Sequence, residues 1–210
     1  MKLRLFTLAF LLATPWVSRA DISIDAGISY FDFRQGRIES NSTVLAVDDP
    51  GKVAPFVAAT FGFSKRFGLR ASYHYITDVK SVIKYGSMPG SGPITTPVIV
   101  YGHYEDDIHL FSFSPEFKWS PSPTLTLAAG PQLNWVASRG RVAYSSTDPT
   151  VLLMAPHRKN DDGFTLGGTA RAIWSVSAKT ALSLGYQYLD LDPSFNRRSH
   201  VLSASFQLSF

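Results

Sequence analysis

Eight segments of this chain alternate, residue by residue, between apolar side chains and small or polar ones. The segment from His200 to Phe210 shows the pattern most clearly, because its even positions from Leu202 onward are apolar and its odd positions from Ser203 onward are serine or glutamine. A period of two places the two kinds of side chain on opposite faces of a β-strand. The eight segments cover residues 21–33, 52–65, 67–77, 107–119, 124–137, 163–176, 180–189 and 200–210.

The lengths of these segments and of their connections favour a membrane barrel. Each segment provides the ~9–11 residues that a tilted transmembrane strand needs. Three connections are short, near residues 66, 120–123 and 177–179, and four are longer, at 34–51, 78–106, 138–162 and 190–199. Short periplasmic turns and long extracellular loops are typical of outer-membrane barrels. We therefore predict an all-β fold, an eight-stranded antiparallel transmembrane β-barrel with mobile extracellular loops, present as a monomer.

The positions of the aromatic residues indicate that the outside of this barrel faces lipid. A soluble sandwich or barrel also alternates, but it turns its apolar face inward and needs no aromatic belts. Rings favour the headgroup level of a bilayer, so two belts on one face indicate a spanning strand. We expect one belt at the periplasmic ends and one at the outer ends: Phe67, Phe117, Trp119 and Phe210, and Tyr30, Tyr75, Trp135 and Tyr188.

The first 20 residues have the pattern of an export signal. Lys2 and Arg4 precede a mostly apolar stretch, and Ser18 and Ala20 are the small residues that a signal peptidase requires. We predict cleavage after Ala20, a single barrel domain over residues 21–210 with no further domain, and a location in the bacterial outer membrane. The alternative is an uncleaved anchor, for which the apolar stretch is short.

Composition excludes several classes of function. The signal segment holds three of the 20 basic residues, which leaves 17 against 16 acidic residues, too small an excess to indicate nucleic-acid binding. The chain has no cysteine, so disulfides and thiolate-bound metals are excluded. We expect no cofactor.

Three stretches resemble the small outer-membrane barrels of the OmpA-like, OmpX-like and opacity-protein type. Residues 67–75 (FGLRASYHY) are similar to their third strand, and residues 185–192 (GYQYLDLD) to their penultimate strand. The terminal alternation, with Phe206, Leu208 and Phe210, is similar to the signal that such proteins present to the outer-membrane assembly machinery. The resemblance implies an outer-membrane barrel and one of several roles: adhesion, serum resistance, envelope integrity or a narrow pore.

Several charged residues fall on the inward face of the predicted strands. An isolated buried ion costs several kcal/mol, so these charges are expected to pair or to stay hydrated. We predict an ion-pair network that fills the lumen, with a gated polar path as the alternative; an eight-stranded barrel is barely wide enough for side chains. The inward charges are Asp25, Arg70, His74, Glu116, Lys118 and Arg171.

The longer connections carry clusters of basic residues that would meet at the outer rim. Guanidinium and ammonium groups at this height pair with lipopolysaccharide phosphates or with an anionic host surface ligand. The predicted contact residues are Arg139, Arg141, Arg158, Lys159, Arg197 and Arg198. Oxygen ligands near His103, in Glu105, Asp106 and Asp107, could take Ca²⁺, but a solvated acidic rim explains them as well, and no metal site is predicted.

Catalytic groups are not evident. An acyl hydrolase needs a serine activated by a histidine, and Ser199 and His200 are adjacent in a strand, so their side chains diverge. Ser72 and His74 share a face, but lipid does not reach the lumen. We therefore predict no catalytic residue and a non-enzymatic role in envelope integrity or surface interaction. The alternatives are a small-solute or ion pore and a lipid-modifying acyl hydrolase.

Overall fold

The computed structural model describes residues 21–35, 44–46, 51–88, 98–146, 153–192 and 197–210. Within these ranges the chain contains no helix that is long and apolar enough to span a membrane. The regular elements are strands, and their bounds are β1 Asp21–Gln35, β2 Val44–Ala46, β3 Lys52–Gly62, β4 Phe67–Met88, β5 Val98–Trp119, β6 Leu125–Ser146, β7 His157–Ser175, β8 Thr180–Asp192 and β9 Arg197–Ser209.

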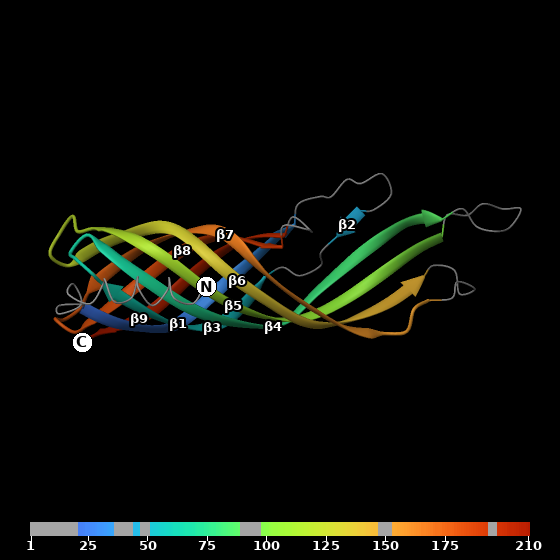
Figure 1. Ribbon diagram of the computed structural model, residues 1–210, viewed down its shortest axis with the longest axis horizontal. Helices are drawn as coiled ribbons and strands as arrows, with labels where there is room; N and C mark the ends of the chain where they lie inside the picture. Colours follow the sequence, from blue (N-terminus) through green and yellow to red (C-terminus); the bar gives the residue numbers. More distant parts are fainter. Residues whose placement is uncertain (1–20, 36–43, 47–50, 89–97, 147–152, 193–196) are drawn as a thin grey trace, which may run out of the picture.

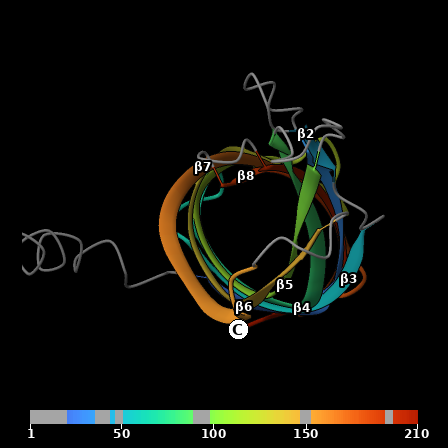
Figure 2. The same cartoon turned by 90° about the vertical axis from the view of Figure 1, so that its right-hand side faces the viewer.

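Eight of these strands close into a barrel. Each of β3 to β8 pairs antiparallel with the next strand, and β1 pairs with both β3 and β9. The β1–β9 seam runs from Ser23 opposite Ser209 to Gln35 opposite Arg197, so the sheet has no open edge along this length. Seen along its axis, the barrel is a closed ring (Figure 2). The predicted eight-stranded antiparallel barrel is confirmed; β2 is a short addition that pairs with Val82–Lys84 of β4.

Serine residues close the three short turns at one end of the barrel, which we call the turn end. The Ser64 hydroxyl accepts the backbone N–H of Phe67 at 3.1 Å, and the Ser122 hydroxyl accepts that of Leu125 at 3.1 Å. The Ser177 hydroxyl accepts the N–H of Thr180, also at 3.1 Å. A serine that bonds the backbone two or three residues later favours a turn over a continued strand.

Alternation separates the two faces of the wall as the sequence indicates. In β3, Val53 and Val57 are 67% and 54% exposed, whereas Ala54, Ala58 and Thr60 are buried inside the barrel. The aromatic residues Phe67, Phe117 and Trp119 are exposed on the outer face near the turn end. An exterior of exposed apolar and aromatic side chains is the surface that a lipid bilayer solvates best.

The strands differ in length, and this gives the barrel a one-sided extension. β4, β5 and β6 have 22 residues each and β7 has 19, but β3 has 11 and β8 has 13. β4 and β5 stay paired up to Met88 and Val98, whereas the β7–β8 pairing ends at Gly167 and Leu189. We call residues 79–88, 98–106, 138–146 and 157–162 the outer extension; they reach beyond the barrel at the right of Figure 1.

The outer extension corrects the predicted loops. Most of residues 78–106 and 138–162 is strand, because the backbone pairing of β4 to β7 continues beyond the barrel wall without an apolar outward face. The predicted signal segment, residues 1–20, and the Gly- and Pro-rich residues 89–97 lie outside the described residues. Cleavage after Ala20 and the 21–210 domain boundary therefore remain predictions.

Candidate functional site

Four charged side chains from four different strands meet inside the barrel. Arg171 on β7 forms a bidentate pair with Glu116 on β5, with Nε–Oε1 and Nη2–Oε2 distances of 2.9 and 2.7 Å. Arg171 Nη1 also lies 3.4 Å from Asp25 Oδ2 on β1, and Arg70 on β4 pairs with the same Asp25 oxygen. All four residues are at most 5% exposed. Two guanidiniums and two carboxylates thus balance in a closed cluster, which we call the ion-pair layer.

Small residues and a hydroxyl complete this layer. Arg70 Nη1 is 3.4 Å from Thr60 Oγ1 on the neighbouring strand. Gly185 faces Arg171 across the β7–β8 pair, and a Cβ there would lie 2.5 Å from Ser203 Oγ and 3.4 Å from Arg171 Cγ. The absence of a side chain at Gly185 therefore gives the arginine room to cross the lumen.

The other two predicted lumen charges lie apart from this cluster. Lys118 is half-buried towards the turn end, against Gly68, and it forms no salt bridge with any residue that the structure describes. His74 is fully buried, but between aromatic rings: its ring stacks on Phe56 at 5.0 Å and meets Phe31 edge-on at 5.5 Å. The structure therefore places His74 inside the lumen, as predicted, but against aromatic rings and not within the ion-pair layer.

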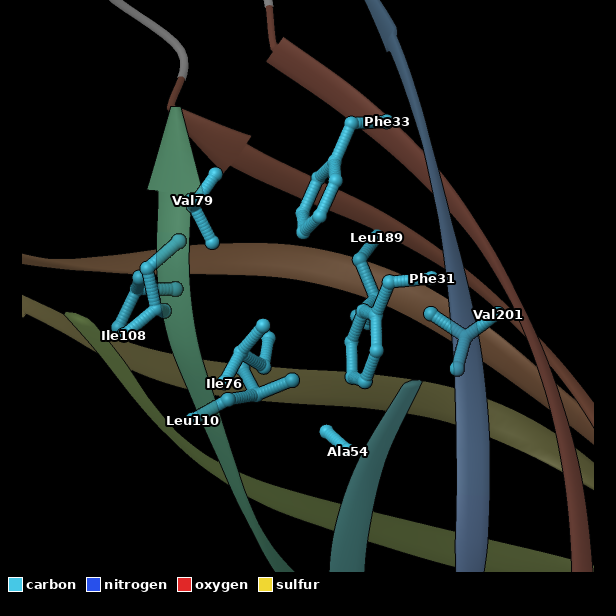
Figure 3. Close-up of a cluster of buried hydrophobic side chains, with 10 residues drawn as sticks. Phe31, Phe33, Ala54, Ile76, Val79, Ile108, Leu110, Leu189 and Val201 are labelled. Atoms are coloured by element: carbon cyan, nitrogen blue, oxygen red, sulfur yellow. The ribbon is translucent and has the colours of Figure 1, made fainter. Parts of the chain in front are cut away.

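Above the ion-pair layer, towards the outer extension, the lumen holds an apolar cluster. Ten side chains form one buried cluster inside the wall, nine of them labelled in Figure 3. This apolar layer comprises Phe31, Phe33, Ala54, Ile76, Val79, Ile108, Leu110, Val136, Leu189 and Val201. We expected a polar lumen throughout, so these residues were missed. The alternation of β1 was a usable signal for them: every second residue faces the lumen, so Phe31 and Phe33 follow Ser29 on the inward face.

The outer face of β4–β7 carries an aromatic row at its junction with the outer extension. Tyr73, Phe111 and Trp135 lie side by side with their rings tilted, at centroid distances of 4.6 and 5.3 Å. Phe164, opposite Trp135 in β7, is 71% exposed. The residues of this row lie on adjacent strands and on the outward face, so the row continues the lipid-facing wall towards the outer extension.

Three predicted contact residues gather just above this aromatic row. Arg139 and Arg141 are alternate residues of β6 and both are exposed on the outward face, while Arg158 of β7 is exposed and lies opposite Arg141. We call these three residues the arginine patch. Lys159 pairs with Gly140 through its backbone. Arg197 and Arg198 belong to β9, which is separated from β7 by β8, so the six residues do not all lie on adjacent strands.

Among the residues that the structure describes, neither the catalytic nor the metal alternative is supported by side chains in a suitable arrangement. Ser199 is buried inside, where it donates to the Asp32 carbonyl at 3.2 Å, whereas His200 Nδ1 lies 2.6 Å from Tyr186 Oη on the outer face. Glu105 is exposed and the neighbouring Asp106 is buried. No group of three or more His, Cys, Asp or Glu side chains suited to a metal ion occurs within the described ranges.

The predicted assembly signal lies on the outer face. Phe206, Leu208 and Phe210 are 46%, 42% and 76% exposed. The backbone N–H of Phe210 donates to the Ile22 carbonyl at 2.9 Å, which joins the last residue to β1. The role of these residues in assembly remains a prediction.

Comparison with known proteins places the fold. No family model and no curated protein matches this sequence. Among solved structures, it is similar to the attachment invasion locus protein Ail of Yersinia pestis, with a TM-score of 0.54 at 11% identity over 91% of this chain and 99% of that one. It is also similar to the outer membrane protein OprG of Pseudomonas aeruginosa, with a TM-score of 0.56 at 12% identity over 91% and 96% of the two chains. The chain therefore has the fold of the small eight-stranded outer-membrane β-barrels.

Proposed function

We propose that the protein spans the outer membrane of a Gram-negative cell as a closed, non-enzymatic barrel that acts in surface interaction. The observation that carries this proposal is the outer extension, in which four paired strands continue beyond the ends of the other strands. A rigid sheet presents side chains in fixed positions, which is the property that a recognition surface needs.

The filled lumen supports this proposal over a pore. A solute would have to pass the ion-pair layer, where the four charged residues are at most 5% exposed, and then the apolar layer, where Phe31, Ile76 and Leu110 are fully buried. An ion in the apolar layer would lose its hydration without gaining a partner, at a cost of several kcal/mol. Asp25 does accept bonds from both arginines, which is the arrangement that exchange of partners requires. Planar-bilayer recordings distinguish the two functions; steady conductance that disappears in Arg171→Ala would favour the pore.

An anionic partner suits the arginine patch. Exposed guanidiniums bind sulfate, phosphate and carboxylate groups through paired hydrogen bonds. The Ail protein, whose fold is similar, has been solved in complex with sucrose octasulfate, a heparin analogue. Because the sequence identity is only 10%, this complex supports an anionic class of partner and not a particular ligand.

Shortening the outer extension tests the proposed function. The register offers two cut points: Val79 opposite Asp106, and Ala137 opposite Asp162. Joining each pair by Asn-Gly makes a two-residue hairpin turn that preserves the strands below it. We expect the shortened barrel to keep its heat-modifiable gel mobility and to lose cell binding to heparin-coated and matrix-coated surfaces.

Two outcomes would contradict the proposal. One is that cells with the full barrel bind these surfaces no better than cells without it. The other is that the shortened barrel binds as well as the full one. A shortened barrel that has lost heat-modifiable mobility is replaced by the two single-hairpin cuts, which are tested in the same way.

A further inference from the structure

We propose that the arginine patch is a phosphate site for a phosphorylated glycolipid of the outer leaflet, of the lipid A type, whose acyl chains lie on the apolar wall of β6 and β7 below it. This inference rests on the proposed function and names a partner for the outer extension. It concerns Arg139, Arg141 and Arg158 together with the wall from Trp135 to Leu166.

The three arginines are close together, and Asp107 and Glu105 of β5 lie opposite Arg139 and Arg141 without forming a salt bridge with them. Alternate residues of one strand lie ~6.6 Å apart, and directly opposed residues on paired strands lie ~5 Å apart at Cβ. Arg141 and Arg158 are directly opposed, so their like charges repel across the strand pair. None of the three arginines forms a salt bridge with a residue in the described part of the chain. A bound phosphate would offset this repulsion with charge-assisted hydrogen bonds.

The patch lies at the height of lipid headgroups. On β5, the outward face runs from Trp119, at the turn end, to His109 in ten residues. Ten steps of ~3.3 Å along a strand tilted by ~40° rise ~25 Å, the height of the apolar band of an outer-membrane barrel. Arg139 and Arg141 pair with Asp107 and Glu105, two and four residues beyond His109. The two arginines therefore lie ~5 and ~10 Å above the apolar band.

The wall below the patch is suited to acyl chains. On the same two strands, Trp135 lies opposite Phe164 and Leu133 lies opposite Leu166. Phe164 and Leu166 are 71% and 73% exposed, more than the other large apolar residues of the spanning wall except Phe210. A ligand that joins phosphates to several acyl chains would contact both the patch and this wall. A soluble polyanion would contact only the patch, which is why we assign the site to a glycolipid.

Acidic side chains limit the site to the β6–β7 side. Glu105 and Asp107 lie on the outward side of β5, next to the arginines, and Asp162 lies below them on β7. Asp107 Oδ1 already accepts the backbone N–H of Asp78 at 3.1 Å. A phosphate is therefore expected to bind on the Arg141–Arg158 side of Arg139, away from β5.

Binding of lipid A to the full-length barrel in phospholipid nanodiscs tests the assignment. The variant is Arg139→Gln/Arg141→Gln/Arg158→Gln. Its matched control removes three exposed basic residues at the turn end, Lys65→Gln/Arg66→Gln/Lys179→Gln. The probes are bis-phosphorylated lipid A, the same lipid after phosphatase treatment, and a heparin fragment. We expect the patch variant to weaken binding of bis-phosphorylated lipid A by at least about tenfold, because hydrogen bonds between charged groups are lost. The control is expected to bind as the wild type does.

Several results would overturn the site. Equal affinity for lipid A with and without phosphates, or an unchanged affinity in the patch variant, would exclude phosphate recognition by these arginines. Equal weakening in the control would show a nonspecific charge effect. Loss of heparin binding with retained lipid A binding would assign the patch to soluble polyanions instead. In that last case the proposed role in surface interaction would still be supported. If instead the shortened barrel adhered as well as the full barrel, the proposed function would be refuted, but the result of the lipid A measurement would still hold.

Discussion

Removing one partner from the ion-pair layer should destabilise the barrel strongly. The change Arg171→Met deletes both bonds to Glu116, at 2.9 and 2.7 Å, and the contact with Asp25 at 3.4 Å. Asp25 keeps Arg70, but Glu116, 1% exposed, loses its hydrogen-bond partner. Breaking a buried pair in this way costs about 3–5 kcal/mol. We expect this loss in the free energy of unfolding.

Removing both partners should cost much less than removing one. Arg171→Met combined with Glu116→Leu leaves apolar side chains of similar length and no buried charge from this pair, an exchange that is often close to neutral. The double variant should therefore be more stable than Arg171→Met alone, and the two changes should be non-additive by about 3 kcal/mol. Arg66→Met, on an exposed turn, is the matched control and should change stability by less than about 0.5 kcal/mol.

Urea unfolding of the barrel in detergent micelles measures these energies. Tryptophan fluorescence follows the transition, because Trp119, Trp135 and Trp174 lie on the outer wall, and linear extrapolation gives the free energy in water. A loss below about 1 kcal/mol in Arg171→Met, with additive changes in the double variant, would refute the reasoning. Glu116 would then be hydrated when unpaired, and the lumen would not be sealed at this layer.

Four further predictions concern other parts of the barrel. Leu110→Ala, in the apolar layer, should lower the free energy of unfolding by about 2–5 kcal/mol through the cavity it leaves, whereas an unchanged urea midpoint would mean that the layer collapses around it. Asp78 lies where the β4–β5 register shifts between Ile76 and Val79, and it has a positive φ of 55°. Asp78→Gly should therefore be tolerated while Asp78→Val lowers the melting temperature; equal melting temperatures would contradict backbone strain at this position. A hydrogen bond from Lys80 lowers the pKa of Asp78, so Lys80→Ala should raise that pKa towards its ordinary value in an NMR titration. Phe210→Ala should reduce the amount of assembled barrel in cells but leave urea stability of the refolded protein nearly unchanged, and equal assembly would remove the assembly role of this ring.

The wall of the barrel could be predicted from the sequence because lipid imposes a strict rule on it. A side chain such as Val57 or Leu184 must be apolar to face lipid, and the alternation of these positions fixes which face each residue of a strand occupies. The same parity places Asp25 and Arg171 inside. Their pairing could not be predicted, because it depends on which strands face each other across the lumen.

Alternation between apolar and polar residues does not by itself indicate the apolar layer or the outer extension, and the reasons differ. Inside the wall, Phe31 and Leu189 are as apolar as the lipid-facing residues, so alternation in composition fades where both faces are apolar. In the outer extension, Arg139 and Arg141 are exposed on the outward face while Val142 is buried on the inward face, so the apolar-outward pattern of the lipid-facing wall is lost. The pattern of apolar outward and polar inward side chains that indicates the wall is absent in both cases, although the backbone pairing continues.

The seam between β1 and β9 has a consequence for how the chain folds. Ser23 pairs with Ser209, so the contact that closes the sheet joins residues from opposite ends of the sequence. Contacts of such high sequence separation require the largest loss of chain entropy, which makes closure slow and late. Until β9 arrives, β1 presents an unpaired edge that can pair with another chain. The time before closure, rather than the stability of the finished barrel, is when this protein is most exposed to aggregation.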